Sequence, residues 1–368
     1  MPKLKSRLWK KCWDNLPILK RMILYFLPLQ AVTQNLSDSL QRDSLYYHSA
    51  FDKLIVGLYY NYNECSITFN PNRNPYPYKP TMNFRTNLPA NIGISFNYDK
   101  IGFSFAFGRS QADSSQVASQ FSSFAFSLGG SRFLIEPSYF RYVGFYDYYS
   151  KNYDSITFKV NRFSHPTMKS TDYALRAFYF FSPKKYIYRA GFSYTYRQTK
   201  KGGSWGLAAQ IYDSSIKNET MFWHDKTLQA YQVPLNQIHN RGIGIGGIGA
   251  FNIPFHFLGS KDKIWLFSLF ASLMLNYKET KFYATDGSVE SKNGMSFEMN
   301  DLRFSIGLNK ERFFFMWNVQ LRYINEKAIN FAMQTQNFNF TANLGWRFNV
   351  QKPKWYEKFT QTKIYKML

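Results

Sequence analysis

Apolar and polar residues alternate with a period of two over much of the chain, and this alternation is the strongest constraint on its fold. It is clearest around the dipeptide Asp99-Lys100, where small or polar residues separate the apolar ones: Ile92, Ile94, Phe96, Tyr98, Ile101, Phe103, Phe105 and Phe107. If the dipeptide is a hairpin loop, antiparallel pairing places Tyr98 opposite Ile101 and Ile92 opposite Phe107. The segment therefore predicts a hairpin with one wholly apolar face.

Thirteen segments with this alternation can be counted, the first near 54–69 and the last at 336–350. A short turn at 182–185 is expected to lead into a strand from Tyr186 to Tyr196. A barrel with both ends on one side needs an even number of strands. The disagreement lies at 205–240, where either a strand within 213–240 is missed or 205–212 belongs to a loop. We therefore predict twelve strands, with fourteen as the alternative.

Longer polar connections separate the hairpins, at about 70–90, 108–119, 146–170, 213–240, 278–297 and 324–335. Short turns that alternate with long connections are typical of an all-β, transmembrane, antiparallel up-and-down β-barrel, with short periplasmic turns and longer extracellular loops. A soluble β-sandwich also has many short strands and is the alternative. Its strands seldom run so long with such uniform aromatic content, so the barrel is favoured.

The composition agrees with a barrel. The chain has 37 Phe, 28 Tyr and 8 Trp among 368 residues, and outer-membrane barrels place aromatic rings in girdles at both interfaces. The mean hydropathy is −0.39. This value does not argue against a membrane, because a barrel alternates lipid-facing apolar residues with polar residues of the lumen.

The amino-terminal region has the pattern of an export signal. Seven Lys and Arg residues precede the apolar run from Met22 to Leu29, which is too short to span a bilayer as a helix. We expect residues 1–33 to be a signal peptide, with an amphipathic membrane anchor or a start at Met22 as alternatives. The rest then divides into a periplasmic amino-terminal segment, a barrel and a basic periplasmic tail, at 34–50, 51–350 and 351–368.

The net charge of +23 first suggests a nucleic-acid partner. However, residues 1–33 carry +6 and residues 351–368 carry +4, so +13 remains spread over the strands and loops between them. Diffuse charge of this kind suits a surface that meets anionic lipid head groups. We therefore expect no nucleic acid, and we expect outer-membrane lipid and lipopolysaccharide as partners.

The last alternating segment contains four residues that resemble the terminal-strand signal read by the barrel-assembly machinery: Asn343, Gly345, Phe348 and Val350. Unlike many barrels, the chain continues beyond this strand to Leu368. Over about residues 50–350 it resembles uncharacterised outer-membrane β-barrel proteins of Gram-negative bacteria. The resemblance implies an outer-membrane location and the assembly machinery as a partner, and it implies no catalytic residues.

No catalytic, cofactor or metal site is predicted. None of the five histidines forms an H-x-x-x-H or H-E-x-x-H pair, and no nucleophile elbow, P-loop or CxxC pair occurs. Cys12 lies in the expected signal, so Cys65 has no predicted disulfide partner. The glycines at 242–249 are interpreted as small lumen-facing positions in a bent strand.

Charged residues point into the lumen if the apolar register faces outward: Glu136, Asp172, Arg176, Arg189, Asp301, Arg303, Arg322 and Arg347, together with Gln320. They predict either an ion-paired network that fills a narrow barrel or a basic constriction that selects anionic solutes. Twelve to fourteen strands give a diameter between filled barrels and open porins, which favours the network.

Three hypotheses for function follow. The first is a channel or an envelope structural or transport protein with a polar, charged lumen. The second is a surface protein that binds a partner through its long loops. The third is a lipid-modifying enzyme, for which no catalytic constellation is visible, so we expect that the chain is not an enzyme.

Overall fold

The computed structural model describes residues 46–50, 53–71, 81–88, 90–111, 117–154, 159–223, 234–256, 265–328, 331–351, 354–363 and 365. They belong to two units, of which one carries every strand and the other contains the short helix α5 (Lys354–Thr360). The expected signal peptide and Cys12 lie outside the described residues. Among the helices that are described, none is long and apolar enough to cross a bilayer.

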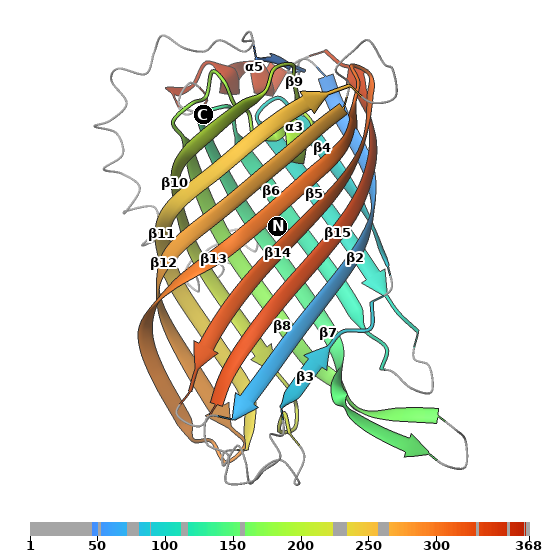
Figure 1. The fold of residues 1–368 in the computed structure, drawn as a ribbon, viewed down its shortest axis with the longest axis vertical. Coiled ribbons are helices and arrows are strands. Elements are labelled where there is room, and N and C mark those ends of the chain that lie inside the picture. Colours follow the sequence, from blue (N-terminus) through green and yellow to red (C-terminus); the bar gives the residue numbers. More distant parts are fainter. Residues whose placement is uncertain are drawn as a thin grey trace, which may run out of the picture. The chain divides into compact units, whose positions relative to one another are not determined.

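Twelve strands close into one antiparallel ring, which confirms the predicted fold and the lower of the two strand numbers (Figure 1). The ring closes where the last strand pairs with the first along its whole length. In ring order the strands are β2 (Lys53–Pro71), β4 (Asn91–Tyr98), β5 (Ile101–Arg109), β6 (Gln120–Gly129), β7 (Phe133–Asp154), β8 (Lys159–Phe180), β10 (Gly202–Lys217), β11 (Leu235–Phe255), β12 (Trp265–Ala284), β13 (Val289–Asn309), β14 (Phe313–Lys327) and β15 (Phe331–Asn349).

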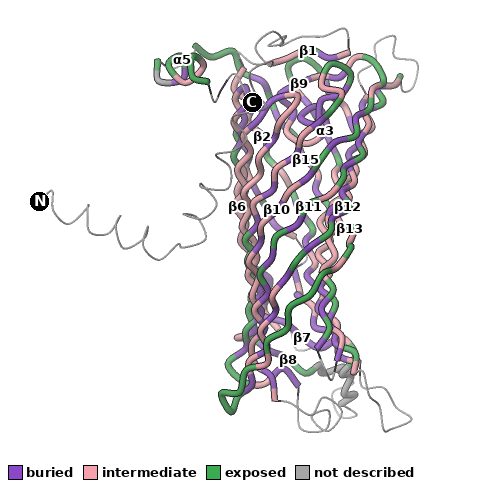
Figure 2. Tube along the Cα trace, turned by 90° about the vertical axis from the view of Figure 1, so that its left-hand side faces the viewer, coloured by how far each residue is buried: buried purple, intermediate pink, exposed green. Residues whose placement is uncertain are grey.

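The hairpin around Asp99-Lys100 has the predicted register, with Tyr98 opposite Ile101 and Ile92 opposite Phe107. Exposure alternates along the ring strands (Figure 2). The interpretation of the glycine run is right for Gly242 and Gly244, which are buried, and wrong for Gly247 and Gly249. Ile248 takes the inward position between that second pair, so both of these glycines face outward.

The predicted strand from Tyr186 to Tyr196 is wrong. Residues 181–201 instead form a connection that contains α3 (Arg189–Phe192) and β9 (Tyr196–Gln198), and β9 pairs with β1 (Tyr47–Ser49). This false strand is the surplus in the count of thirteen. The suspected region 205–212 is part of β10, which pairs with β8 and β11 in the ring.

Several expected loops are shorter than predicted because the strands continue through them. Strands β12 and β13 run to Ala284 and from Val289, so the connection expected at 278–297 is a four-residue turn. Strands β14 and β15 likewise leave only residues 328–330 between them. We call this end of the barrel the loop end, and we call the opposite end, with the turns at 99–100, 130–132 and 310–312, the turn end.

The number of strands around the ring falls toward the loop end. Strands β4, β5 and β6 are short, and beyond them β3 (Met82–Arg85) pairs with β2 on one side and with β7 on the other. One strand therefore occupies the sector that three strands occupy nearer the turn end. Because β3 is antiparallel to both neighbours, the alternation of strand directions around the ring is preserved.

An apolar belt surrounds the outside of the barrel. Its last row toward the loop end runs across four adjacent strands, through Ile211, Ile243, Tyr277 and Met295. The next outward row is polar throughout, and it consists of Asp213, Arg241, Glu279 and Asn293. The change from one row to the next marks a sharp edge of the belt.

The β13–β14 ladder is interrupted inside this belt. Backbone pairing extends only from Asn309 to Leu302 of β13, although both strands continue toward the loop end. The cause is a bulge at Asn300, which has no partner between Ser272 and Leu273 of β12. A bulge bends its strand, so β13 diverges from β14 beyond this point.

Candidate functional site: a closed lumen

The connection 181–201, which we call the plug segment, fills the lumen at the turn end. Six consecutive residues, Tyr186 to Gly191, are buried. They pack against inward side chains of the wall, such as Phe178 and Phe270 on one side and Leu266 and Phe314 on the other. A wall strand would bury only alternate residues, so burial on both faces explains why this aromatic segment is not part of the ring.

Inward asparagine and arginine side chains bind the backbone of the plug segment. Asn252 Nδ2 donates to Ile187 O at 2.8 Å, and Asn309 Nδ2 donates to Ala190 O at 3.2 Å. Arg347 Nη2 donates to Tyr194 O at 2.8 Å. Buried carbonyl groups need such partners, so these wall side chains hold the plug segment in one position.

Tyr194 has a positive φ of 63°, which is uncommon for an aromatic residue. Its ring stacks on Phe314 with the ring centroids 4.1 Å apart, and its hydroxyl accepts a hydrogen bond from Asn318 Nδ2 at 2.5 Å. The Phe314 ring fits because Gly345 lies beneath it: a Cβ at this glycine would be 2.3 Å from Phe314 Cζ. Surrounding contacts thus maintain a backbone conformation that is unfavourable by itself.

An ion-paired network crosses the lumen next to the plug segment. Arg303 Nη2 on β13 lies 3.0 Å from Glu136 Oε2 on β7 and 2.5 Å from Asp301 Oδ2. Asp301 also binds Arg176 Nη1 of β8 at 3.2 Å, and Arg322 Nη1 of β14 lies 3.7 Å from Asp172 Oδ2. Three arginines face three carboxylates, so the charges balance. This is the arrangement of the network interpretation and not that of a basic constriction.

Tyr188 joins the plug segment to this network. Its hydroxyl donates to Glu136 Oε1 at 3.1 Å and accepts a hydrogen bond from Arg303 Nη1. Burial raises the pKa of Tyr188 well above its usual value, so the phenol stays protonated and can donate. Displacement of the plug segment would break both of these contacts.

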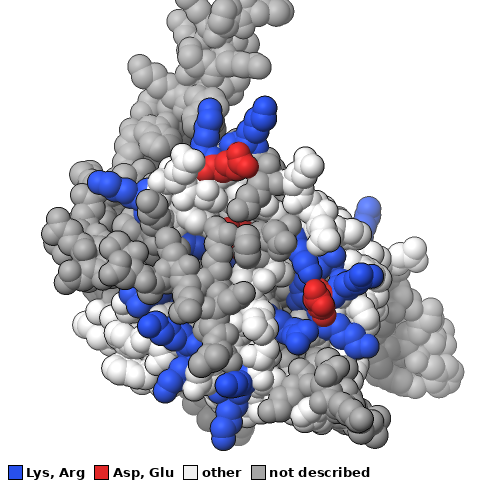
Figure 3. All heavy atoms as spheres, turned by 90° about the horizontal axis from the view of Figure 1, so that it is seen from above, with Lys and Arg blue, Asp and Glu red and all other residues white. Residues whose placement is uncertain are grey.

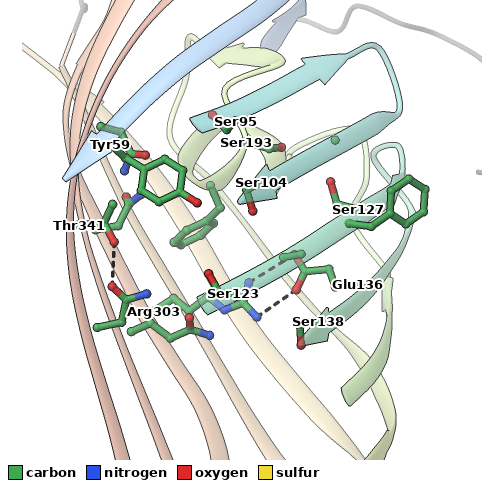
Figure 4. A pocket seen from close by; sticks show the side chains of 18 of the residues that line it. Tyr59, Ser95, Ser104, Ser123, Ser127, Glu136, Ser138, Ser193, Arg303 and Thr341 are labelled. Carbon is green, nitrogen blue, oxygen red and sulfur yellow. Dashed lines mark hydrogen bonds and ion pairs between the residues drawn. The ribbon is translucent and has the colours of Figure 1, made fainter. Parts of the chain in front are cut away.

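A polar cavity of about 230 Å³ lies between the plug segment, the network and the inner face of β4–β6. Figure 4 shows Arg303 and Glu136 meeting at this cavity, with serine hydroxyl groups around them. Asn61 Oδ1, Ser138 Oγ and Asn343 Nδ2 are buried and have no hydrogen-bond partner among the described residues. Such groups are ordinarily satisfied by water or by a small polar molecule.

Aromatic side chains close the lumen at the loop end. Phe222 and Trp223, from the connection after β10, are buried among Phe69, Phe282 and Phe331 of the wall. The cluster also contains Phe84 and Met82 from β3 and the thiol of Cys65, which is a free cysteine.

The structure places all the predicted lumen residues inside the barrel, in two groups. Glu136, Asp172, Arg176, Asp301, Arg303, Gln320 and Arg322 belong to the network, where Gln320 Nε2 donates to Asp301 Oδ1 at 2.9 Å. Arg189 and Arg347 instead hold the plug segment: Arg189 Nη1 donates to Lys100 O at 2.6 Å and to Gly129 O at 2.8 Å.

Of the predicted assembly residues, Asn343 and Gly345 face inward, and Phe348 and Val350 face outward. Sequence reasoning did not find the plug segment or the role of Tyr188. No signal in the local alternation distinguishes this segment from a wall strand. Among the described residues, no group of three or more His, Cys, Asp or Glu side chains could hold a metal ion.

The comparison with protein families decides where the chain belongs. A family model described as a domain of unknown function, DUF4421, matches residues 41–348. The chain belongs to the DUF4421 family. The comparison of this DUF4421 chain with curated proteins gives no match.

Among solved structures, the DUF4421 barrel is similar to three outer-membrane proteins at low identity. The P. putida toluene transporter TodX is 7% identical, with 82% of this chain and 91% of that chain covered and a TM-score of 0.26. The outer membrane protease OmpT from Escherichia coli is 8% identical, with 84% and 100% covered and a TM-score of 0.32. The translocator domain of autotransporter NalP from Neisseria meningitidis is 10% identical, with 89% and 98% covered and a TM-score of 0.29. The function of none of them is carried over to this chain.

Proposed function

We propose that this protein is an integral outer-membrane barrel whose lumen is closed, and that it acts in the envelope as a structural or binding protein and not as an open channel. The observation that carries the proposal is the closure of the lumen along its axis. The plug segment fills the turn end, the ion-paired network crosses the middle, and the aromatic cluster fills the loop end.

The height of the apolar belt supports a position in a membrane. On β12 the outward residues are apolar from Trp265 to Tyr277. With a rise of about 3.3 Å per residue and a tilt of about 45°, this stretch spans roughly 28 Å. The apolar band of outer-membrane barrels is about 25 Å tall, so the belt has the height that a bilayer requires.

Reconstitution into planar bilayers tests the proposal. Because the lumen is closed at both ends, the folded protein should give no steady conductance. Heat-modifiable migration on a gel should verify that the reconstituted protein is folded. A steady open-channel current from the wild-type protein would refute the closed state.

Two variants test which elements close the lumen. Replacement of residues 186–198 by a Gly-Ser linker removes the buried part of the plug segment, but the aromatic cluster remains, so no conductance is expected. The same replacement combined with Phe222→Ala and Trp223→Ala opens both ends and also removes the contacts of Tyr188 with Glu136 and Arg303 in the network, so this variant should conduct. Tyr149→Ala, which changes an exposed aromatic residue at the loop end, is the matched control and should not conduct in the same background.

A second candidate function rests on the interrupted β13–β14 ladder. Between these strands Lys278 Nζ lies 2.9 Å from Glu298 Oε1 of β13 and 3.1 Å from Glu326 Oε1 of β14. Side chains thus bridge the strands where no backbone ladder is described, at the depth of the apolar belt. Such a seam would let an amphiphile exchange laterally between the bilayer and the lumen.

Thiol reactivity in vesicles tests this seam. A cysteine at Ile324, an inward position of β14 beyond the ladder, should react with a lipid-soluble maleimide. Native Cys65 is the internal control, because it is fully buried inside the aromatic cluster and its strand β2 pairs with β15 along its whole length. Equal protection of both thiols would exclude the lateral route.

The third hypothesis, a lipid-modifying enzyme, stays the least supported. Purified protein that turns over a phospholipid or acyl substrate would establish it, and we expect no turnover.

A further inference from the structure

A second hollow lies at the turn end, outside the closed lumen. It has a volume of about 290 Å³ and lies between the small β1–β9 sheet and the rim of the barrel. Its lining includes Lys53 at the start of β2, Arg197 of β9, Lys310 and Glu311 of the β13–β14 turn, and Arg347 near the end of β15. We call this hollow the rim pocket.

Positive charge in the rim pocket is not balanced. Four cationic side chains face one carboxylate, Glu311, which gives a surplus of three charges. Glu311 pairs with Lys53 at 3.5 Å, and its side chain is 78% exposed. Among the described residues, Arg197, Lys310 and Arg347 form no ion pair with a carboxylate, although Glu311 interacts favourably with Arg347 over a longer distance. The pocket therefore differs from the lumen network, in which each arginine meets a carboxylate.

Two of these cations are held near each other in spite of their repulsion. The guanidinium groups of Arg197 and Arg347 interact unfavourably with each other. Arg347 is fixed there because it also holds the plug segment through Tyr194 O. Arg197 Nε is buried and has no hydrogen-bond partner among the described residues. A buried, unpartnered donor on a charged group is costly unless a ligand satisfies it.

Basic side chains also gather around the turn end in the end-on view, with few acidic ones (Figure 3). The five charged residues of the rim pocket come from four elements that are distant in the sequence, namely β2, β9, the β13–β14 turn and β15. Folding therefore brings these charges together, since no run of basic residues in the sequence does so.

We propose that the rim pocket binds a phosphate group. A surplus of three charges suits a polyvalent anion better than a single carboxylate, and arginine and lysine are the usual donors to phosphate oxygens. A phosphate in the pocket places negative charge beside Arg197 and Arg347, and this charge relieves the repulsion between them. The group can belong to a soluble phosphate or to the head group of a phospholipid that borders the barrel.

Binding of inorganic phosphate to the full-length protein in a phosphate-free, uncharged detergent tests the proposal, by calorimetry at low salt. Saturable binding is expected, and it should weaken as the salt concentration rises. Arg197→Gln and Lys310→Gln should each weaken it by about tenfold, which corresponds to about 1.4 kcal/mol. Lys310 is exposed, so its replacement keeps the test valid if Arg197→Gln does not fold.

Lys217→Gln is the matched control, because Lys217 is an exposed lysine of the ring at the loop end. It should leave phosphate binding unchanged. A second arm distinguishes the source of the phosphate: native mass spectrometry counts the phospholipids that the protein retains from phosphatidylglycerol nanodiscs.

Loss of one retained phospholipid in Arg197→Gln or Lys310→Gln, but not in Lys217→Gln, would identify the ligand as a lipid head group. Saturable binding of inorganic phosphate with unchanged lipid retention would identify a soluble ligand. If neither phosphate binding nor lipid retention differs between the rim-pocket variants and the wild type, the proposal is wrong.

Discussion

Replacement of Arg303 by methionine should destabilise the barrel by about 3–5 kcal/mol, the usual effect of leaving a buried charge uncompensated. Arg303 binds two carboxylates, Glu136 at 3.0 Å and Asp301 at 2.5 Å. Without it, Asp301 keeps Arg176 at 3.2 Å and Gln320 at 2.9 Å. Among its described contacts, Glu136 keeps only the hydrogen bond from the Tyr188 hydroxyl of the plug segment. The free energy of unfolding should therefore fall mainly because Glu136 loses its counter-charge.

A second variant separates the charge effect from the loss of packing. Glu136→Gln alone should lower the free energy of unfolding by about 1–3 kcal/mol, since Arg303 keeps Asp301 as a partner. The double variant Arg303→Met/Glu136→Gln restores equal numbers of arginines and carboxylates. The double variant should be no less stable than Arg303→Met alone. Its loss of stability should therefore be smaller than the sum of the two single losses by more than about 1 kcal/mol.

Equilibrium urea titration in lipid vesicles, followed by tryptophan fluorescence, measures these free energies. The midpoint should move while the slope stays constant if only the stability of the folded state changes. If the two single effects add to within about 0.5 kcal/mol, the residues act independently. The network would then not be the unit that the distances indicate.

Two further predictions concern single positions. Gly345→Ala should lower the stability by about 1–3 kcal/mol in thermal unfolding, because the added Cβ would overlap the Phe314 ring and overpack the site. The control is Gly249→Ala, whose Cβ would meet nothing within 4 Å and which should be near neutral. Equal effects of the two substitutions would contradict the packing argument. In the β12–β13 turn, hydrogen bonds from the Ser288 side chain and backbone lower the pKa of Asp286. Its carboxylate should therefore stabilise the turn above the unfolded pKa, and this contribution should be lost as the pH falls through the lowered pKa. The difference in Tm between wild type and Asp286→Asn should shrink over that range, and a difference independent of pH would refute the interpretation.

The strand ring could be predicted from the sequence because the apolar belt imposes one clear pattern. Within the belt the outward residues are apolar, and in the hairpin around Asp99-Lys100 the residues between them are small or polar. Each ring strand therefore carries the same signal, and the register of that hairpin followed from its turn.

The loop-end halves of the strands could not be recognised because their pattern is reversed. On β12 the outward Tyr277 is followed by outward Glu279 and Lys281, while Phe282 and Ala284 point inward to the aromatic cluster. The alternation thus changes phase in the middle of a strand. A change of phase has the same appearance in a sequence as the end of a strand, so these halves were predicted as loops.

The plug segment could not be separated from the wall for a related reason. Its aromatic residues at 186, 188, 192, 194 and 196 alternate as they would in a lipid-facing strand. The side chains between them, Ile187 and Arg189, are buried as well. Whether such a residue meets lipid or the inside of the barrel depends on tertiary contacts, which local periodicity does not contain.

Because β3 takes the place of three strands at one end, the width of the barrel can differ between its two ends. Barrel diameter grows roughly in proportion to strand number, so the exchange of three strands for one narrows this sector of the wall toward the loop end. The exchange removes two strands, and an even change is the only kind that keeps every neighbour antiparallel. A hairpin could therefore be gained or lost in this sector without a new register anywhere else in the ring. The width of one end can change in evolution while the other end, with its plug segment, stays the same.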